Sequence, residues 1–469
     1  MTTAASTFHA ITSAGPPVTP PAKSLGTAVV LGGSIAGLLA ARVLADHAAT
    51  VLVMERDELP EGGVPRKGVP QGGQAHVLLA AGGGFLERWF PGFTDRAIEA
   101  GACLVTTDRV AVYDDGVPRV NGADVRRLAL TRPFLEDLVR AELRAVPNVK
   151  SLTGRVTGLE FGDTAVTAVT YESAGVSGVE PADLVVDAMG RASRVSDWLE
   201  EAGWDRPPMV RVISGVNYAT AFFRRPPGTP GVGLAMNLTG SKYGGAASGA
   251  IAMAVENDRF IVVQGGYGDF RPGSTAADMV ARCRTEHPEP FGRAVEGEML
   301  GEVATFRQAD SRRRDFCSCE RLPARLVPVG DAVASFNPLY AQGISSASLH
   351  AGALSLFLRS EPDLDVPARA FLDLQRVVVD AAWSISTTGD AAAAAGAGTR
   401  TLAQRVSGWL VARVVAASMT DAPVNRVFVE VTQMLRHPSE LARPGILLRS
   451  LLAARHRRPD PVPPLVREP

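Results

Sequence analysis

A glycine-rich turn between an apolar run and a helical pattern near the N-terminus restricts the fold of this chain more than any other feature. Residues 28–31 are wholly apolar, which is the pattern of a strand buried on both faces of a parallel sheet. The turn Gly-Gly-Ser-Ile-Ala-Gly, 32–37, opens a stretch with apolar residues at helical spacing, and a second apolar run, 50–54, ends in Glu55. Together these segments predict a β-α-β unit of about thirty residues.

The turn has the chemistry of a dinucleotide-binding site. Such a site needs a tight turn at its first glycine, a small residue where the backbone approaches the pyrophosphate, and close packing of helix on strand. Gly32 and Gly37 fit the outer positions and Ser34 fits the middle one, while the helix N-terminus would supply backbone donors. Glu55 follows Gly32 by 23 residues, close to the ~20 expected of the acid that binds a ribose hydroxyl.

Two further motifs follow apolar, strand-like runs. Residues 187–193 read Asp-Ala-Met-Gly-Arg-Ala-Ser, which is also the pattern of a simple turn with a helix N-cap. Later in the chain, Asp331 ends a strand-like run and could accept hydrogen bonds from polyol hydroxyls. Gly343 opens the next helical pattern and would present bare N–H groups to an electron-rich ring edge. A strand, loop and capped helix without a ligand is the alternative for this segment.

Composition and charge exclude several classes of protein. In 469 residues, 48 Lys and Arg balance 49 Asp and Glu, so the chain lacks the basic excess that nucleic-acid binding requires. Four cysteines make no disulfide framework, and Cys317 and Cys319 have no second pair nearby, so no metal site is expected. We find neither a signal peptide nor an apolar run of ~18 residues, and we expect a cytoplasmic protein without a membrane span.

The sequence changes character several times along its length. Prolines dominate both ends, strand-like runs rich in β-branched and aromatic residues occupy the middle, and helical periodicity follows. The expected parts are a disordered leader (1–24), an α/β domain (25–204 and 309–360), a mainly antiparallel β layer inserted into it (205–308), a C-terminal helical region (361–454) and a flexible tail (455–469).

The three motifs occur in the order, and at the approximate distances, found in one known family. From about Thr27 to Leu358 the chain resembles FAD-dependent monooxygenases of the para-hydroxybenzoate hydroxylase fold. The resemblance implies an α/β fold, with a Rossmann-like FAD-binding domain, an inserted mainly antiparallel β substrate-binding domain and C-terminal helices. In that family the first motif binds the ADP part of FAD. The Asp-Gly motif lies near the pyrophosphate and helps with nicotinamide cofactor use, and the Gly-Asp motif holds the ribitol and the flavin ring.

The resemblance also implies which residues bind FAD. Glu55 would hold the adenosine ribose, Arg56 would lie against the adenine, and Val156 would lend its backbone to that base. Arg132, which opens a long helical pattern, would reach the pyrophosphate or ribityl region. The expected FAD-binding set is Gly32, Ser34, Ala36, Gly37, Glu55, Arg56, Arg66, Lys67, Arg132, Val156, Gly190, Asp331, Pro338, Gly343 and Ile344.

Shorter stretches are similar to bacterial polyether epoxidases, the flavin enzymes that epoxidise polyene chains of the monensin and lasalocid type. This similarity implies a large apolar polyketide substrate in antibiotic biosynthesis. It also implies that Arg66 and Lys67 lie near the isoalloxazine, a solvated pair on a Gly/Pro-rich loop being the alternative. The stretches are 66–71 (Arg-Lys-Gly-Val-Pro-Gln), Ala75-His76, Tyr218-Ala219-Thr220 and 336–340 (Phe-Asn-Pro-Leu-Tyr). The β layer would enclose the substrate with Tyr218, Phe222, Met236, Met253 and Val263, together with the C-terminal helices.

The resemblance implies monooxygenation through a flavin C4a-hydroperoxide formed from O2, whose outer oxygen is electrophilic. An alkene attacks that oxygen without a protein base, whereas a phenol must first lose a proton. His76 is a candidate for such a base, with a packed structural histidine as the alternative, and no other catalytic residue is identified. We therefore expect alkene epoxidation, with an aromatic hydroxylase and a non-redox FAD-binding cyclase or scaffold as alternatives. Electrons would come from NAD(P)H or from a separate flavin reductase.

Overall fold

The first β-α-β unit lies at the centre of a five-stranded parallel sheet, as the sequence predicts. In order across the sheet the strands are β17 (Leu326–Pro328), β11 (Leu184–Asp187), β1 (Leu25–Leu31), β2 (Ala48–Glu55) and β7 (Val149–Thr153), and each neighbouring pair is parallel. Helix α2 (Ile35–Leu44) connects β1 to β2. The computed structural model describes residues 3–19, 21–59, 61–124, 126–226, 232–239, 248–394, 402–453 and 460–466.

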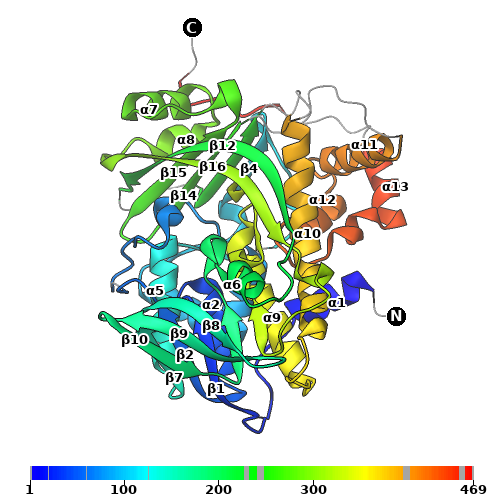
Figure 1. The fold of residues 1–469 in the computed structure, drawn as a ribbon. Coiled ribbons are helices and arrows are strands. Elements are labelled where there is room, and N and C mark those ends of the chain that lie inside the picture. Colours follow the sequence, from blue (N-terminus) through cyan, green and yellow to red (C-terminus); the bar gives the residue numbers. More distant parts are fainter. Residues whose placement is uncertain are drawn as a thin grey trace.

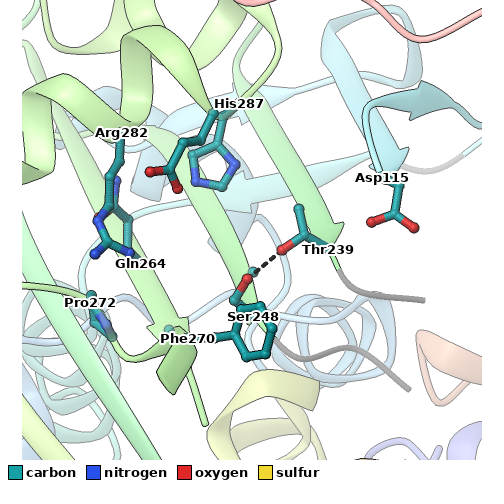
Figure 2. A pocket seen from close by; sticks show the side chains of 11 residues that line it. Asp115, Thr239, Ser248, Gln264, Phe270, Pro272, Arg282 and His287 are labelled. Atoms are coloured by element: carbon teal, nitrogen blue, oxygen red, sulfur yellow. Dashed lines mark hydrogen bonds between the residues drawn. The ribbon is translucent and has the colours of Figure 1, made fainter. Parts of the chain in front are cut away.

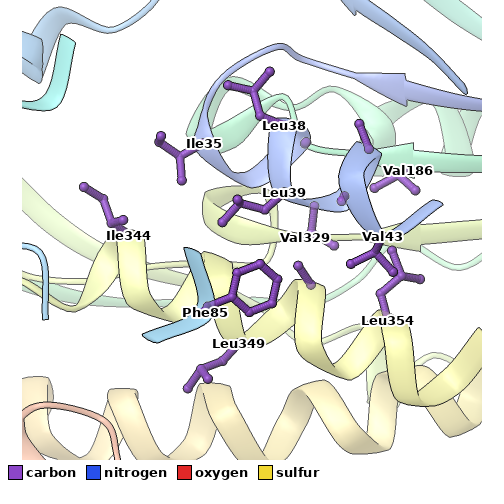
Figure 3. Packing of buried hydrophobic residues seen from close by; sticks show 14 of the residues in the cluster. Ile35, Leu38, Leu39, Val43, Phe85, Val186, Val329, Ile344, Leu349 and Leu354 are labelled. Atoms are coloured by element: carbon purple, nitrogen blue, oxygen red, sulfur yellow. The ribbon is translucent and has the colours of Figure 1, made fainter. Parts of the chain in front are cut away.

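The main core forms where α2 packs on this sheet and on α9 (Gln342–Arg359). Figure 3 shows Leu39 and Val43 of α2 facing Leu349 and Leu354 of α9, with Phe85 of α3 (Ala80–Trp89) beside them. All five side chains are fully buried. Each burial of this kind stabilises the fold by about 1.5–3 kcal/mol. The packing therefore fixes the N-termini of α2 and α9, which both follow predicted motifs.

A second, eight-stranded sheet lies above the parallel sheet in Figure 1, and α7 (Ala276–Thr285) and α8 (Glu289–Ala294) cover its outer face. It is mainly antiparallel, with one parallel pair, β4 with β13. It extends beyond the predicted 205–308, because strands from both sides of that segment join it. Its order is β18 (Ala334–Ser335), β16 (Met299–Arg314), β12 (Met209–Arg224), β15 (Arg259–Gly266), β14 (Ser248–Val255), β13 (Leu234–Thr239), β4 (Val110–Asp114) and β5 (Val117–Pro118).

The remaining elements surround these two sheets. Three antiparallel strands, which the sequence did not indicate, form a separate small sheet. They are β8 (Arg155–Phe161), β9 (Val166–Ser173) and β10 (Val176–Pro181), and a two-stranded pair joins β3 (Cys103–Val105) to β6 (Arg127–Ala129). The other helices are α4 (Phe93–Glu99), α5 (Arg132–Arg144), α6 (Val195–Glu201), α10 (Arg369–Ala394), α11 (Leu402–Ala417), α12 (Ala422–Thr432) and α13 (Pro444–Ala453).

The predicted disordered leader is wrong for its first half. Residues Ala4–Thr12 form helix α1, which Thr3 caps, and Phe8 and Ile11 are fully buried against the core. The two apolar side chains lie on one face of a short helix and pack near α9 and α10, which stabilises it.

The predicted flexible tail is also partly packed. In its described part, 460–466, the Val462 N–H donates to the Gly116 carbonyl and the Val466 N–H to the Arg284 carbonyl, both at 2.9 Å. Among the residues that the structure describes, no helix is long and apolar enough to cross a bilayer.

Candidate functional site

The three predicted motifs meet at one edge of the parallel sheet. They follow β1, β11 and β17, whose carboxyl ends lie at the same edge, the usual ligand position in open α/β sheets. A Cβ on Gly32, at φ +107°, would lie 2.6 Å from the Ala188 carbonyl oxygen, and one on Gly330, at φ +61°, would lie 2.6 Å from the Cβ of Ala36. Gly37 likewise leaves no room for a Cβ beside the Gly32 carbonyl. Glycine is therefore required where the motifs touch.

A polar chain links the first motif to the start of α5. The Ser34 hydroxyl donates to Glu136 at 2.8 Å and accepts from the Arg132 guanidinium at 3.1 Å. The other terminal nitrogen of Arg132 lies 3.4 Å from Nε2 of His76. The Nε of Arg132 is buried without a hydrogen-bond partner in the described structure. A buried guanidinium with an unused donor fits an anionic group in this crevice.

The same guanidinium faces the third motif. Burial lowers the pKa of Arg132, while Glu136 and Asp331 partly restore it. Burial also raises the pKa of Asp331, and Arg132 is the strongest of the cations that oppose this rise. The Cβ position of Gly190 lies 3.9 Å from the Cβ of Asp331, so the second motif is in contact as well. The site therefore combines a half-buried carboxylate with a positively charged wall.

Asp187, which ends β11, has a local role. Its carboxylate accepts from the Ser193 hydroxyl at 2.5 Å and from the Met189 N–H at 3.1 Å. Burial raises its pKa to about 6, against these two hydrogen bonds. The contacts hold the turn that carries Gly190 beside Asp331.

Glu55 and Arg66 form a buried ionic cluster at the end of β2. The Glu55 carboxylate accepts from the Gly33 N–H at 2.9 Å and lies 3.2 Å from the Arg66 guanidinium. Arg66 also pairs with Asp57 and Glu136, each at 2.8 Å. The structure thus places Arg66 beside the expected ribose acid, rather than with the residues expected near the isoalloxazine. The attraction of three carboxylates explains this position.

The other residues expected at the adenosine end lie around this cluster. Val156 is half-buried on β8, and the neighbouring Gly154 N–H donates to the Glu55 carbonyl at 2.8 Å, which connects β8 to β2. Arg56 is exposed and lies 3.7 Å from Asp57. Lys67 is exposed on the loop after Arg66.

The N-terminus of α9 fits a ring edge that accepts hydrogen bonds. Gly343 faces open space, since a Cβ at this position would meet no atom within 4 Å. Gln342 is 1% exposed, yet neither polar atom of its amide has a partner in the described structure. Ala341, at φ +53°, turns the chain into the helix, and Ile344 packs into the core. Bare backbone donors at a helix start are suited to carbonyl oxygens and ring nitrogens.

An apolar pocket of about 70 Å³ lies between the β layer and this loop. Tyr218, Met236 and Val263 line it from the β layer, and Pro338 of the loop and His76 also line it. The sequence did not indicate that two glutamines line this pocket, one in the 3-10 turn at 70–73 and one just after it. Nor did it indicate that several apolar residues at alternating strand positions line it. The lining residues that were not predicted include Gln71, Gln74, Leu238, Ile251, Phe306 and Leu339.

Two residues expected in the substrate pocket lie elsewhere. Phe222 packs under the Arg259 guanidinium, 4.8 Å from its ring centre, and Met253 is 2% exposed within the core. Neither lines the described pocket. Both lie on the same face of the β layer as lining residues, since Phe222 is four positions from Tyr218 and Met253 is two positions from Ile251. Their positions farther along these strands, and not the face, remove them from the pocket.

His76 is held neutral at the pocket wall. Its Nδ1 lies 2.9 Å from the Gln74 carbonyl, which only accepts, so Nδ1 carries the proton. Burial and, to a smaller extent, the Arg132 charge lower the pKa of His76 to about 3, against the Gln74 hydrogen bond. At neutral pH this imidazole is therefore a poor base, because its conjugate acid is too strong.

Asn337 fastens the loop before α9 to the β layer. It is fully buried, and its Oδ1 accepts from the Tyr218 hydroxyl at 3.1 Å. Its Nδ2 donates to the Tyr267 hydroxyl at 2.8 Å. The Phe-Asn-Pro run is visible in the sequence, but this role of the asparagine is not, because both partners are distant along the chain.

Comparison with known proteins identifies a relative by sequence and many solved structures with a similar fold. No protein-family model matches the chain. Protein Rv3254 of Mycobacterium tuberculosis is 34% identical over 349 residues, covering 71% of this chain and 73% of that protein.

Among solved structures, p-nitrophenol 4-monooxygenase PnpA from Pseudomonas putida DLL-E4 superposes with a TM-score of 0.60 at 18% identity, over 88% of this chain and 99% of that one. Diels-Alderase PyrE3 of the pyrroindomycin pathway gives 0.55 at 18% identity, over 87% and 80%. The α/β architecture, with one parallel and one mixed sheet, matches the fold of FAD-dependent monooxygenases.

Proposed function

This chain belongs to the same family as Protein Rv3254, and on that premise we propose that it is an FAD-dependent monooxygenase that epoxidises an alkene of a large apolar metabolite. The observation that carries the proposal is the meeting of the Ser34 turn, Arg132 and Asp331 at one sheet edge, beside an apolar pocket. When bound, FAD supplies the activation of O2, and the chain supplies position and dryness.

The side chains that would bind FAD are assigned to three of its parts: the pyrophosphate, the ribose and the ribityl chain. Ser34 and Arg132 would bind the pyrophosphate, because Arg132 is a buried cation with an unused donor. Glu55 would bind the ribose with its remaining acceptor capacity, and Asp331 would accept from the ribityl hydroxyls. The close-approach positions are Gly32, Ala36, Gly37 and Gly190, and the flanking ones are Arg56, Arg66, Lys67, Val156, Pro338, Gly343 and Ile344.

The pocket favours an alkene over a phenol. A phenol needs a base to remove its proton, and His76 is neutral with a pKa of about 3. Among the residues described as lining the pocket, none is a carboxylate, lysine or arginine. An alkene needs only to be held in place and kept from water, for which Tyr218, Met236 and Val263 supply apolar surface. A polyene or polyketide substrate of antibiotic biosynthesis, in a cytoplasmic setting, fits this chemistry with only its reacting double bond inside the pocket of about 70 Å³.

Two other functions remain candidates on this fold. An aromatic hydroxylase would share all the flavin contacts but would need a base from another source. A non-redox cyclase that keeps FAD for structure is favoured by the shared fold with Diels-Alderase PyrE3. For either monooxygenase, electrons would come from NAD(P)H or from a flavin reductase partner.

The test starts with the colour of the purified protein. We expect a yellow protein whose FAD is retained on gel filtration, and incorporation of one labelled oxygen atom from ¹⁸O2 into an isolated-alkene substrate after reduction. Arg132→Gln should weaken FAD binding, whereas Arg376→Gln, which changes an exposed arginine paired with Asp373, should not. A colourless protein that takes up no FAD would refute the proposal. A yellow protein that converts a polyene to a ring-closed isomer without added oxygen would favour the cyclase.

A further inference from the structure

Two C-terminal helices, α11 and α13, expose large apolar side chains at one edge of the molecule. Figure 1 shows both helices there with α12, separated from the eight-stranded sheet by α10. Their inner sides meet in a small core, to which α11 contributes Val414 and Ala417 and α13 contributes Ala453. Six large side chains, each between 43% and 60% exposed, form what we call the C-terminal face: Val406, Trp409, Val411, Leu448, Leu451 and Leu452.

Helix α13 is apolar on both of its sides. Ser450 and Ala453 are buried on the side that faces the small core. Leu448 and Leu452 are each two positions from Ser450, about 200° around the helix, and therefore point away from that core. Helices that are apolar all round are normally buried. The outer leucines thus form a surface that needs a partner outside the described chain.

The part of the chain that carries these helices is basic, although the whole chain is not. Residues 402–459 contain nine arginines and three carboxylates, whereas the complete chain has a net charge of −1. Helices α11 and α13 contain no Asp or Glu. The excess of arginine makes this region complementary to an anionic surface. All three carboxylates are paired with arginines: Asp421 with Arg449, Glu430 with Arg436, and Glu440 with Arg436 and Arg443.

Trp409 and Arg413 have the chemistry that helices use at a membrane surface. The Arg413 guanidinium lies 5.3 Å from the centre of the Trp409 ring, and both side chains are exposed. The amphipathic ring of tryptophan is favoured at the level of the lipid headgroups, and arginine is attracted to anionic lipids. The pair therefore adds a polar and charged border to the apolar C-terminal face.

Two other places on the surface lack this combination. The cavity of about 280 Å³ beside α7, shown in Figure 2, places Arg282 in the same wall as Asp115 and the hydroxyl of Thr239. Ile213 of β12 is 81% exposed, more than any residue of the C-terminal face, but its cross-strand partner is Asp310. In each of these places a carboxylate accompanies the exposed groups, and neither offers a wide apolar area.

We propose that the C-terminal face binds the surface of an anionic lipid bilayer, with its leucines and Trp409 at the boundary of the acyl chains and the arginines of this region against the headgroups. A second copy of this chain is a poorer occupant, because two basic faces would repel each other across the contact. Binding to a bilayer would bring the protein close to apolar metabolites dissolved there, but it does not depend on the proposed flavin chemistry.

The experiment measures co-sedimentation of the full-length protein with lipid vesicles. The vesicles contain either phosphatidylcholine alone or phosphatidylcholine and phosphatidylglycerol in equal parts. We expect the protein to bind the mixed vesicles at least ~10-fold more tightly than the neutral ones, since each arginine near an anionic surface contributes about 5-fold. High salt concentration should weaken this binding, because it screens the charges.

Side-chain variants test whether the C-terminal face makes the contact. The double variant Leu448→Ser/Leu452→Ser should weaken binding to mixed vesicles at least ~10-fold, because it removes two apolar side chains from the contact. Ile213→Ser is the matched control, since it changes an exposed apolar residue of β12 outside this face, and it should bind like wild type. Arg413→Gln should weaken binding to mixed vesicles about 5-fold and leave binding to neutral vesicles unchanged.

Tryptophan fluorescence of the wild-type protein gives a second readout that does not require the leucine variant to fold. Trp409 is the one exposed tryptophan of the five in the chain, all of which the structure describes. Mixed vesicles should shift the emission to shorter wavelength, and Trp409→Phe should remove the shift while it still sediments. The proposal is wrong if the protein does not sediment with mixed vesicles, or if Ile213→Ser weakens binding as much as the leucine variant. It is also wrong if light scattering shows a dimer that the leucine variant converts to a monomer, without vesicle binding by either.

Discussion

His350 provides a quantitative test of how the loop after β17 is held. It is fully buried on α9, and its Nδ1 accepts from the Gly330 N–H at 2.9 Å. Burial lowers its pKa to about 3 from the ordinary 6.5. An unfolded chain takes up a proton on this histidine below pH 6.5, and the folded chain does not. The stabilisation is therefore complete above pH 6.5 and is lost as the pH falls toward 3.

The magnitude follows from these two pKa values. At pH 8 neither state binds this proton. At pH 5 the unfolded state binds it almost completely and the folded state hardly at all. Lowering the pH from 8 to 5 therefore removes about 2 kcal/mol of unfolding free energy. His350→Asn keeps an acceptor near the position of Nδ1 and cannot be protonated. We expect this variant to lose about 2 kcal/mol less unfolding free energy than wild type between pH 8 and pH 5.

The assay is urea unfolding at pH 8 and pH 5, followed by far-ultraviolet circular dichroism. His350→Leu is the comparison, because it leaves the buried Gly330 N–H without an acceptor and should cost about 1–3 kcal/mol at pH 8. The other histidines whose pKa burial lowers (His47, His76, His287 and His437) are present in every variant, so their contributions cancel. Equal pH dependence in wild type and His350→Asn would refute the reasoning.

Three further predictions concern other contacts. Gly330→Ala should destabilise the fold by about 1–3 kcal/mol and reduce FAD retention on gel filtration, because φ is +61° and Ala36 occupies the space; Gly343→Ala, which meets no atom, should unfold like wild type. Phe8→Ala should lower the unfolding free energy by about 3–5 kcal/mol in urea titrations, whereas an unchanged midpoint would mean that α1 does not contribute. Tyr218→Phe should cost about 0.5–1.5 kcal/mol in thermal unfolding, and a double-mutant cycle with Asn337→Ala should show coupling between the two sites.

The parallel sheet was predictable because its signals are local. A short apolar run, a glycine turn and a helical pattern follow one another within residues 28–55, and each of them alone restricts the backbone. Helix α1 was missed because it is only nine residues long and depends on Phe8 and Ile11 packing against distant helices. Strands β8, β9 and β10 were missed because β8 and β10 are largely exposed, and the buried residues of β9, Val166, Ala168 and Val169, do not alternate regularly with polar ones.

The site was predictable in its glycines and less so in its charges. Gly32, Gly37 and Gly330 have the conformations or close contacts that their motifs require. Arg66 was expected near the flavin ring, yet it pairs with Asp57, Glu136 and Glu55, the acid expected to bind the ribose. One of these partners lies 70 positions away, and no sequence pattern states which carboxylates will surround an arginine after folding.

The contact of Asn337 with both Tyr218 and Tyr267 has a consequence for engineering. One amide joins the loop that leads into α9 to strand β12 and to the residue that follows strand β15 of the other sheet. A chimera that took its β layer from a relative lacking either hydroxyl would have a strained junction between the β layer and the loop before α9. Good packing inside the transferred β layer would not remove this strain. Substrate range in this scaffold should therefore be altered by changing side chains in place, with the two tyrosines and the asparagine exchanged only as a set.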